Sequence, residues 1–234
     1  MNSTPIVDVI IPAFNEEKSI VKVIGDIPKL VRYVVVANNN STDRTAEVAM
    51  EVGAQVVFEP QKGYGKACLT AMEWIKRQDV QPDILVFLDG DYSDYPEELA
   101  DLIAPILANK ADLVIGSRSM GQREVGSMTL PQVFGNGLAT LLMRWMYGAK
   151  FSDLGPFRAI SWSKLLDLGM VDQNFGWTIE MQIKAHQAKL RYLEVPVTYR
   201  KRIGVSKVSG TVKGVFGAGY KIIFTIFKYW RPFR

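Results

Sequence analysis

Short apolar runs alternate with longer amphipathic stretches through the first half of the chain. The runs are rich in Val and Ile, as expected for strands buried on both faces of a sheet, and lie at residues 7–11, 33–36, 55–58, 84–88 and 112–115. The stretches between them have room for roughly two to four helical turns and lie at residues 16–30, 42–52, 65–77 and 96–108. This alternation predicts an α/β fold in which an open, mainly parallel sheet carries helices on both faces.

Polar residues follow three of the predicted strands. Residues 12–17 come after the first strand, residues 38–43 after the second, and residues 89–91 after the fourth. Because the carboxyl ends of parallel strands meet at one edge of the sheet, ligands bind there. We therefore expect the three polar clusters to line one crevice.

Asp89, Gly90 and Asp91 form the most specific of these clusters. Two carboxylates separated by one glycine can place oxygens on a single divalent cation, and the glycine lets a ligand approach the backbone. Mg²⁺ and Mn²⁺ take such oxygen ligands and share the rest of their coordination with substrate phosphates. A solvated acidic turn is the alternative use of an Asp-Gly pair. Because residues 89–91 come directly after a buried apolar run, we favour a metal site.

The Asn-rich run at residues 38–43 has two interpretations. Asn tolerates left-handed backbone conformations, and Ser41 or Thr42 can cap the helix that follows, so the run can serve as a strand-to-helix connection. If it shares the crevice with Asp89, the amides of Asn38 and Asn39 can also contact a base or ribose.

Charge divides the chain after Glu194. The net charge of +4 is the sum over two unlike segments. Residues 1–194 have 19 basic and 24 acidic side chains, and residues 195–234 have nine basic and no acidic ones. Residues 205–230 predict a helix with a broad apolar side, which is typical of a helix lying in a membrane interface. Packing of this helix on the body or on a second subunit, in a homo-oligomer, is the alternative. The acid-free composition favours an anionic membrane surface as its partner.

Several classes of protein are excluded. The single cysteine, Cys68, rules out an internal disulfide and a Cys-based zinc site. The sequence contains no run of 18 apolar residues, so it predicts no transmembrane span. Residues 1–15 lack the basic region of a signal peptide. No Gly-rich dinucleotide fingerprint follows the first strand, and we expect no nucleic-acid partner. We expect a cytoplasmic protein that is peripheral at the membrane face.

Seven motifs, in order along nearly the whole chain, carry a resemblance to a known family. The chain resembles a family 2 glycosyltransferase with the Rossmann-like GT-A fold, and especially the dolichyl-phosphate and polyprenyl-phosphate sugar transferases. We therefore expect a GT-A domain at residues 1–204 and a basic amphipathic C-terminal helix at residues 205–234. The motifs are VIIPAFNEE (9–17), NSTDRT (40–45), GYGKA (63–67), DGD (89–91), GSR (116–118), DLGPFRA (153–159) and EVPVTYR (194–200).

The resemblance implies that a sugar moves from a nucleoside diphosphate sugar to an acceptor, here a lipid phosphate, with Mn²⁺ or Mg²⁺ as cofactor. Asp89 and Asp91 would hold the metal. Catalysis would rest on Asp91, Arg118 and Asp153, and Asp153 would act as general base if the acceptor were a hydroxyl. The residues implied to bind the nucleotide sugar are Pro12, Ala13, Phe14, Glu16, Asn38, Asn39, Lys66, Asp89, Gly90, Arg202 and Lys207.

Two departures from the family pattern keep alternatives open. Relatives usually carry Asp where this chain has Asn38 and Asn39, which leaves the base undetermined. Relatives also often place Gln two residues after the second metal-binding Asp, where this chain has Ser93 followed by Asp94. The alternatives are transfer to a soluble hydroxyl acceptor and a sugar-nucleotide-binding module without catalysis. Intact Asp89 and Asp91 argue against the second.

Overall fold

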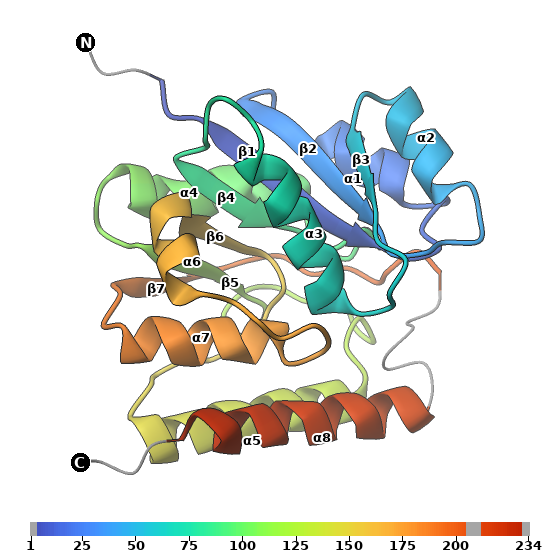
Figure 1. The fold of residues 1–234 in the computed structure, drawn as a ribbon. Helices are drawn as coiled ribbons and strands as arrows, with labels where there is room; N and C mark the ends of the chain where they lie inside the picture. Colours follow the sequence, from blue (N-terminus) through green and yellow to red (C-terminus); the bar gives the residue numbers. More distant parts are fainter. Residues whose placement is uncertain (1–3, 205–211, 231–234) are drawn as a thin grey trace.

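One mixed sheet organises the computed structural model, which describes residues 4–204 and 212–230. The strand order is β3-β2-β1-β4-β6-β5-β7 (Figure 1). The strands are β1 (Val7–Ala13), β2 (Val31–Asn38), β3 (Gln55–Phe58), β4 (Ile84–Phe87), β5 (Leu113–Ser117), β6 (Arg158–Ser161) and β7 (Tyr192–Pro196).

The sheet is parallel except at β6. β3, β2, β1 and β4 run parallel, β6 runs antiparallel to both β4 and β5, and β7 is parallel to β5. The predicted mainly parallel α/β sheet is confirmed, and the five predicted strands correspond to β1–β5. The apolar pattern did not predict β6 and β7, which are short and whose sequences also contain charged residues.

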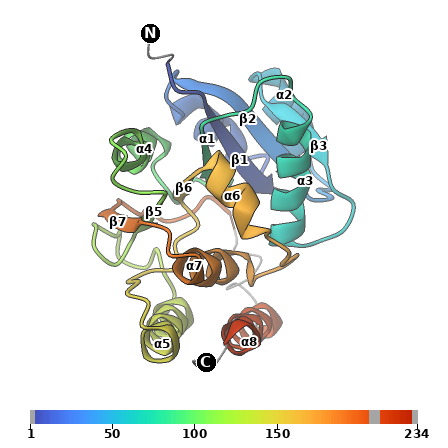
Figure 2. The same ribbon diagram turned by 60° about the vertical axis from the view of Figure 1, so that its left-hand side comes forward.

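Helices cover both faces of the sheet (Figure 2). Alternating residues of β1 divide between two hydrophobic cores, with Val9 and Ile11 on one side and Ile10 on the other. The first core is closed by α1 (Ile20–Asp26), α2 (Thr45–Glu51) and α4 (Leu99–Leu107), which follows the short 3-10 helix η1 (Pro96–Glu98). The second is closed by α3 (Tyr64–Lys76), α6 (Trp162–Leu168) and α7 (Trp177–Gln187).

The expected cap of the helix after β2 is wrong. α2 begins at Thr45, its N-cap residue Arg44 makes no side-chain cap, and the Thr45 N–H donates to the Asp43 carboxylate at 3.0 Å. Ser41 instead accepts a hydrogen bond from the Asn15 N–H at 3.0 Å, and the Thr42 N–H donates to the Asn15 side-chain oxygen at 2.8 Å. These side chains join the loops after β1 and β2, and this brings two of the polar clusters together.

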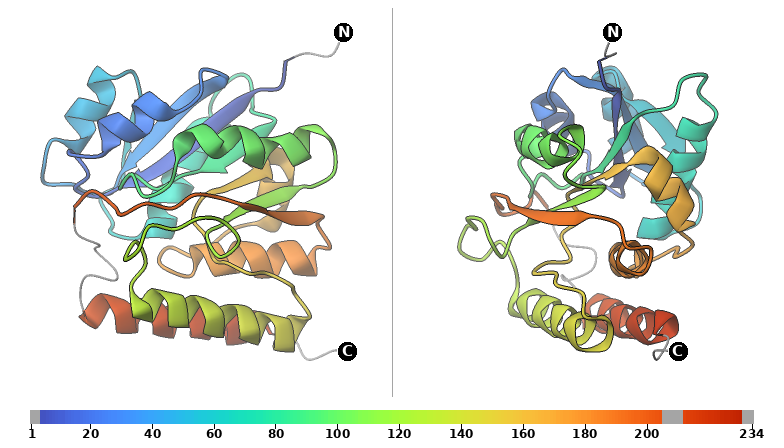
Figure 3. Two further views of the ribbon diagram at one scale, coloured as in Figure 1. Left: turned by 180° about the vertical axis from the view of Figure 1, so that it is seen from behind. Right: turned by 90° about the vertical axis from the view of Figure 1, so that its left-hand side faces the viewer.

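Two long helices form a further layer beyond α7. α5 (Leu130–Tyr147) and α8 (Val212–Tyr229) lie side by side, as both views of Figure 3 show. The predicted C-terminal helix is confirmed over residues 212–229, while residues 205–211 lie outside the described residues. Of the helices within residues 4–204 and 212–230, none combines the length and apolar character that crossing a bilayer requires.

Candidate active site

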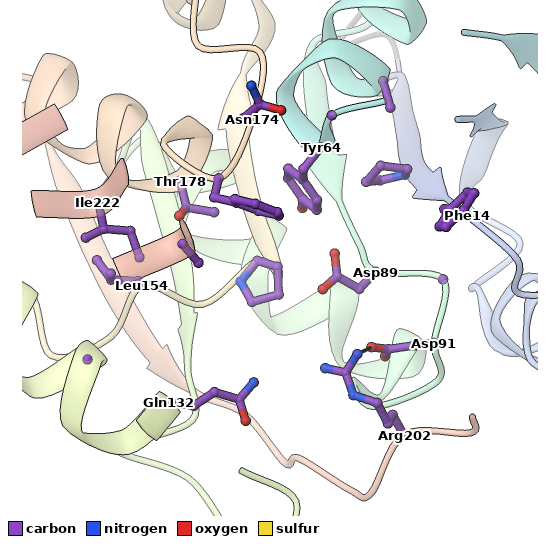
Figure 4. A pocket seen from close by; sticks show the side chains of 18 of the residues that line it. Phe14, Tyr64, Asp89, Asp91, Gln132, Leu154, Asn174, Thr178, Arg202 and Ile222 are labelled. Atoms are coloured by element: carbon purple, nitrogen blue, oxygen red, sulfur yellow. Dashed lines mark ion pairs between the residues drawn. The ribbon is translucent and has the colours of Figure 1, made fainter. Parts of the chain in front are cut away.

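A cavity of about 580 Å³ opens at the carboxyl ends of the strands and extends toward α5 and α8 (Figure 4). The three polar clusters after β1, β2 and β4 all contribute to its wall, so they share one crevice as the strand pattern predicts. Of the residues expected to form the site, those that line the cavity are Pro12, Ala13, Phe14, Glu16, Asn39, Asp89, Gly90, Asp91, Arg118 and Arg202.

Asp89 and Asp91 stand together at the polar end of the cavity. One oxygen of Asp91 lies 2.7 Å from the Arg202 guanidinium, and the other accepts a hydrogen bond from the Ser93 hydroxyl at 2.5 Å. The Oδ1 atom of Asp89 is buried without a hydrogen-bond partner. Burial, and then the charge of Asp91, raise the pKa of Asp89 to about 6, while Arg202 acts in the opposite direction. The pair therefore carries negative charge that the neighbouring side chains only partly balance.

Asp94 adds a third carboxylate close enough to this pair to interact with both charges. It is buried, and neither of its oxygens has a hydrogen-bond partner. Burial, together with the charges of Asp89 and Asp91, raises its pKa well above the usual range. Among the described residues no group of three or more His, Cys, Asp or Glu side chains could enclose a metal ion. The carboxylates of Asp89 and Asp91, with Asp89 Oδ1 left without a hydrogen-bond partner, fit a cation whose coordination is completed by a substrate's phosphates.

Arg118 reaches the cavity and is held from behind by Asp153. The Arg118 side chain donates to the two Asp153 oxygens at 2.6 and 2.9 Å, and its backbone N–H donates at 2.7 Å. Burial opposes the charge of Arg118, but the Asp153 hydrogen bonds outweigh it and the pKa of Arg118 is raised. Asp153 itself is fully buried and does not line the cavity. In this arrangement Asp153 orients Arg118, whereas Arg158 donates to the backbone carbonyls of Gly155 and Thr178.

Besides Asp153, three described residues of the expected site, Asn38, Asn39 and Lys66, do not project into the cavity as donors. The Asn38 side-chain oxygen accepts a hydrogen bond from the Ser41 N–H. Asn39 reaches the cavity wall, but its side-chain nitrogen donates to the Gln61 carbonyl and its oxygen accepts from the Gly63 N–H, in the loop before α3. Lys66 points to Glu59, 3.9 Å away, outside the cavity. Lys207 lies outside the described residues.

Several residues of the cavity wall were absent from the expected set. Tyr64 belongs to the GYGKA motif, so its position had a signal in the sequence, and its ring lies beside Asp89 in the cavity wall. Leu154, Pro156 and Tyr199 also belong to motifs. A further group comes from stretches without a motif, in α5, the loop before α7, the start of α7, and α8. This group includes Gln132, Asn136, Phe175, Thr178, Gly219 and Ile222.

A family model described as glycosyl transferase family 2 matches residues 8–168, which is more than half of the chain. The chain is a family 2 glycosyltransferase. It is therefore an enzyme, and a binding module without catalysis is set aside. Its matched segment contains β1–β6 with the carboxylates of the cavity, while α7, β7 and α8 follow it.

Relatives and solved structures agree with this membership. The glycosyltransferase is 38% identical over 213 residues to an uncharacterized glycosyltransferase of Mycobacterium tuberculosis, covering 89% of this chain and 92% of that protein. It is 30% identical over 206 residues to a dolichyl-phosphate hexose transferase of Haloferax volcanii, covering 86% and 85%. The fold matches the crystal structure of glucosyl-3-phosphoglycerate synthase from M. tuberculosis with Mn²⁺, UDP and glucosyl-3-phosphoglycerate. The TM-score is 0.75 at 22% identity, covering 97% of this chain and 80% of that one.

Proposed function

We propose that this glycosyltransferase moves a sugar from a nucleoside diphosphate sugar to a polyprenyl phosphate at a membrane surface. The observation that carries the proposal is a cavity with two unlike ends. One end holds Asp89, Asp91 and Arg202, and the other is walled by Leu154 and Ile222 where α5, α7 and α8 meet (Figure 4). A donor diphosphate suits the first end, and an isoprenoid chain suits the second.

The donor end has the charges that a sugar diphosphate requires. Asp89 and Asp91 would hold Mn²⁺ or Mg²⁺, and such a cation, when bound, neutralises the charge that develops on the leaving diphosphate. Arg202 places a further positive charge 2.7 Å from Asp91. Phe14 lies on the opposite side of the carboxylates from Ile222, where an aromatic ring can stack on a base (Figure 4). A solved neighbour with the same fold contains Mn²⁺ and UDP, which supports this assignment.

The acceptor end supports an anionic nucleophile. A lipid phosphate is already ionised and needs no general base, whereas a hydroxyl must lose a proton. Asp153, the expected base, is fully buried behind Arg118 and bonded to it. Arg118 lines the cavity and would contact the acceptor phosphate. One relative is a dolichyl-phosphate hexose transferase, which points to the same class of acceptor.

The orientation of α8 supports a membrane partner. Phe216 and Tyr220 face outward and are 75% and 72% exposed, while Lys221 and Thr225 face the protein. Beside it, Trp145 on α5 is 80% exposed. Such a surface is unfavourable in water, but it suits a membrane interface, where aromatic rings sit at the headgroup level. No acidic residue lies in residues 195–234, so anionic lipid would attract this part of the chain.

The test is a transfer assay with purified protein, a panel of UDP- and GDP-sugars, and undecaprenyl phosphate in vesicles containing anionic lipid. We expect one lipid-linked product, lost when EDTA removes the divalent cation and lost in Asp89→Asn. A parallel arm offers 3-phosphoglycerate as a soluble acceptor. Sugar transfer to that acceptor and none to the lipid would contradict the proposal.

A further inference from the structure

α8 is fixed to the body by a polar stripe rather than by apolar residues alone. Lys221, Thr225 and Tyr229 recur at every fourth position and so share one face of the helix. The Lys221 ammonium lies 2.9 Å from Asp172 Oδ2, and the Tyr229 hydroxyl donates to Glu180 at 2.6 Å. Both acids are buried. Two buried carboxylates of the body therefore fix the position of this helix.

Asp172 connects α8 to a loop. While its Oδ2 atom faces Lys221, its Oδ1 atom accepts the backbone N–H groups of Asn174 and Gly176 at 2.8 and 3.1 Å. Gly176 permits the close approach of α8, because a Cβ atom there would lie 2.6 Å from the Thr225 hydroxyl oxygen. One carboxylate thus joins the helix to the turn at residues 172–176.

This turn touches the donor side of the cavity through its backbone. The Lys66 N–H donates to the Gln173 carbonyl at 2.9 Å. A Cβ atom on Gly63 would lie 2.2 Å from the Gln173 oxygen, and one on Gly65 would lie 2.0 Å from the Asp172 oxygen. The turn and the start of α3 are therefore in backbone contact with no side chain between them, so we expect a displacement of one to displace the other.

Tyr64, between the two glycines, brings this contact to the metal carboxylates. It lines the cavity, and its ring lies beside Asp89, with which it interacts electrostatically (Figure 4). Asn174 lines the cavity beside it. A continuous series of contacts thus runs from Lys221 on α8, through Asp172 and the turn at 172–176, to residues 63–66, where Tyr64 lies beside Asp89.

We propose that the Asp172–Lys221 ion pair transmits the position of α8 to the start of α3 at residues 63–66, so that seating of α8 on a membrane sets the donor side of the cavity. Asp172 and Lys221 are positioning residues in this scheme, since neither touches the donor. The inference rests on the proposed membrane function and names its regulation. Packing alone does not require this pair, because apolar residues of similar size often stabilise a fold equally well in place of a buried ion pair.

The first experiment tests the pair in solution. Lys221→Met removes the charge, Lys221→Arg restores it, and Lys228→Met is the matched control, because Lys228 is an exposed lysine of the same helix. We expect hydrogen exchange of the Lys66 amide to become about tenfold faster in Lys221→Met. The KM for the donor should rise about tenfold, with kcat changed less than about threefold. Lys221→Arg and Lys228→Met should match the wild type, and an unchanged Lys66 amide in Lys221→Met would overturn the proposal.

The second experiment adds vesicles of phosphatidylcholine with about a third phosphatidylglycerol, a composition chosen to attract basic segments. In the wild type, vesicles should slow exchange in α8 and also at residues 63–66, and in Lys221→Met only in α8. Slowing of α8 alone in the wild type, or no binding to vesicles, would overturn the coupling.

These outcomes separate the coupling from the proposed function. Sugar transfer to undecaprenyl phosphate without any response at residues 63–66 would refute the coupling only. A response at residues 63–66 on vesicles, in a protein that transfers sugar to no polyprenyl phosphate, would refute the proposed acceptor and support the coupling.

Discussion

The sheet edge around Asp89 and the layer formed by α5 and α8 are built on opposite principles. In the sheet and its covering helices, apolar side chains such as Ile10 and Ala71 face the core, and the polar groups gather at the strand ends. In α8 the aromatic side chains of Phe216 and Tyr220 face outward, and Lys221 faces a buried acid. The first region suits water and a charged ligand, and the outward face of the second suits an apolar environment.

Charge follows the same division. The strand ends concentrate carboxylates, with Asp89, Asp91 and Asp94 within one short segment, whereas the sequences of α5 and α8 contain no acidic residue at all. Both regions wall one cavity. The contrast teaches that the cavity joins two environments, so substitutions in the two regions should affect different measurements.

The largest effect is expected at the charged edge. Asp91→Asn removes a carboxylate that pairs with Arg202 and is proposed to hold the metal, so transfer should fall about 100- to 1000-fold. Titration with Mn²⁺ should show weaker activation, because one oxygen anchor is lost. Asp101→Asn, an exposed position on α4, is the control and should keep wild-type kcat. Full activity of Asp91→Asn would show that this edge is not the reaction centre.

Asp153→Asn distinguishes a base from a positioning residue. Because the substitution leaves the buried Arg118 without its counter-charge, the free energy of unfolding should fall by about 3 kcal/mol. Urea denaturation measures this, with Asp167→Asn, exposed on α6, as the control. The folded fraction should retain turnover within about tenfold of the wild type, with an unchanged pH profile of kcat. Complete loss of turnover in folded protein would instead favour a hydroxyl acceptor that needs Asp153 as base.

The sequence predicted the charged edge more fully than the helical layer. Asp89 and Asp91 follow a buried strand and Phe14 follows another, so the topology of a parallel sheet brings them together. The orientation of individual side chains was harder to predict. Lys66 is only two residues from Tyr64, yet the start of α3 turns it toward Glu59 and away from the cavity. Asn39 forms its hydrogen bonds with Gln61 and Gly63 in the loop before α3. The spacing of residues in the sequence does not reveal this pairing.

In the helical layer, the sequence predicted that α8 is a helix, but not which of its faces contacts the body. The period of apolar residues in α8 is visible in the sequence, but a period alone does not say which face meets the body. Lys221 is the residue that decides this, and its partner Asp172 lies in a loop that carries no motif. Long-range pairing of this kind depends on the tertiary fold, so local pattern could not supply it.

Removing one outward ring tests the apolar side of the contrast. Phe216→Ser should weaken binding to anionic vesicles about tenfold or more, since burying an aromatic side chain in the interface contributes about 2 kcal/mol. Thermal stability in solution should stay the same, because Phe216 is exposed. Phe58→Ser is the matched control, a 60% exposed phenylalanine on β3, and co-sedimentation measures both. Equal binding by the two variants would contradict a membrane role for α8.

The smallest effect is expected where the two environments meet. Gly135 on α5 lines the cavity, and a Cβ atom there would have no other atom within 4 Å. Glycine therefore keeps the apolar end open, although it weakens a helix by about 1 kcal/mol. Gly135→Leu should fill this space and raise the KM for the lipid acceptor about fivefold, while hydrolysis of the donor stays unchanged. Gly137→Leu, in equally open space but off the cavity, should gain the same helix propensity without the change in KM. An acceptor KM that is equal in both variants would place the lipid elsewhere, and a loss of donor hydrolysis in Gly135→Leu would mean that the two ends are not separate.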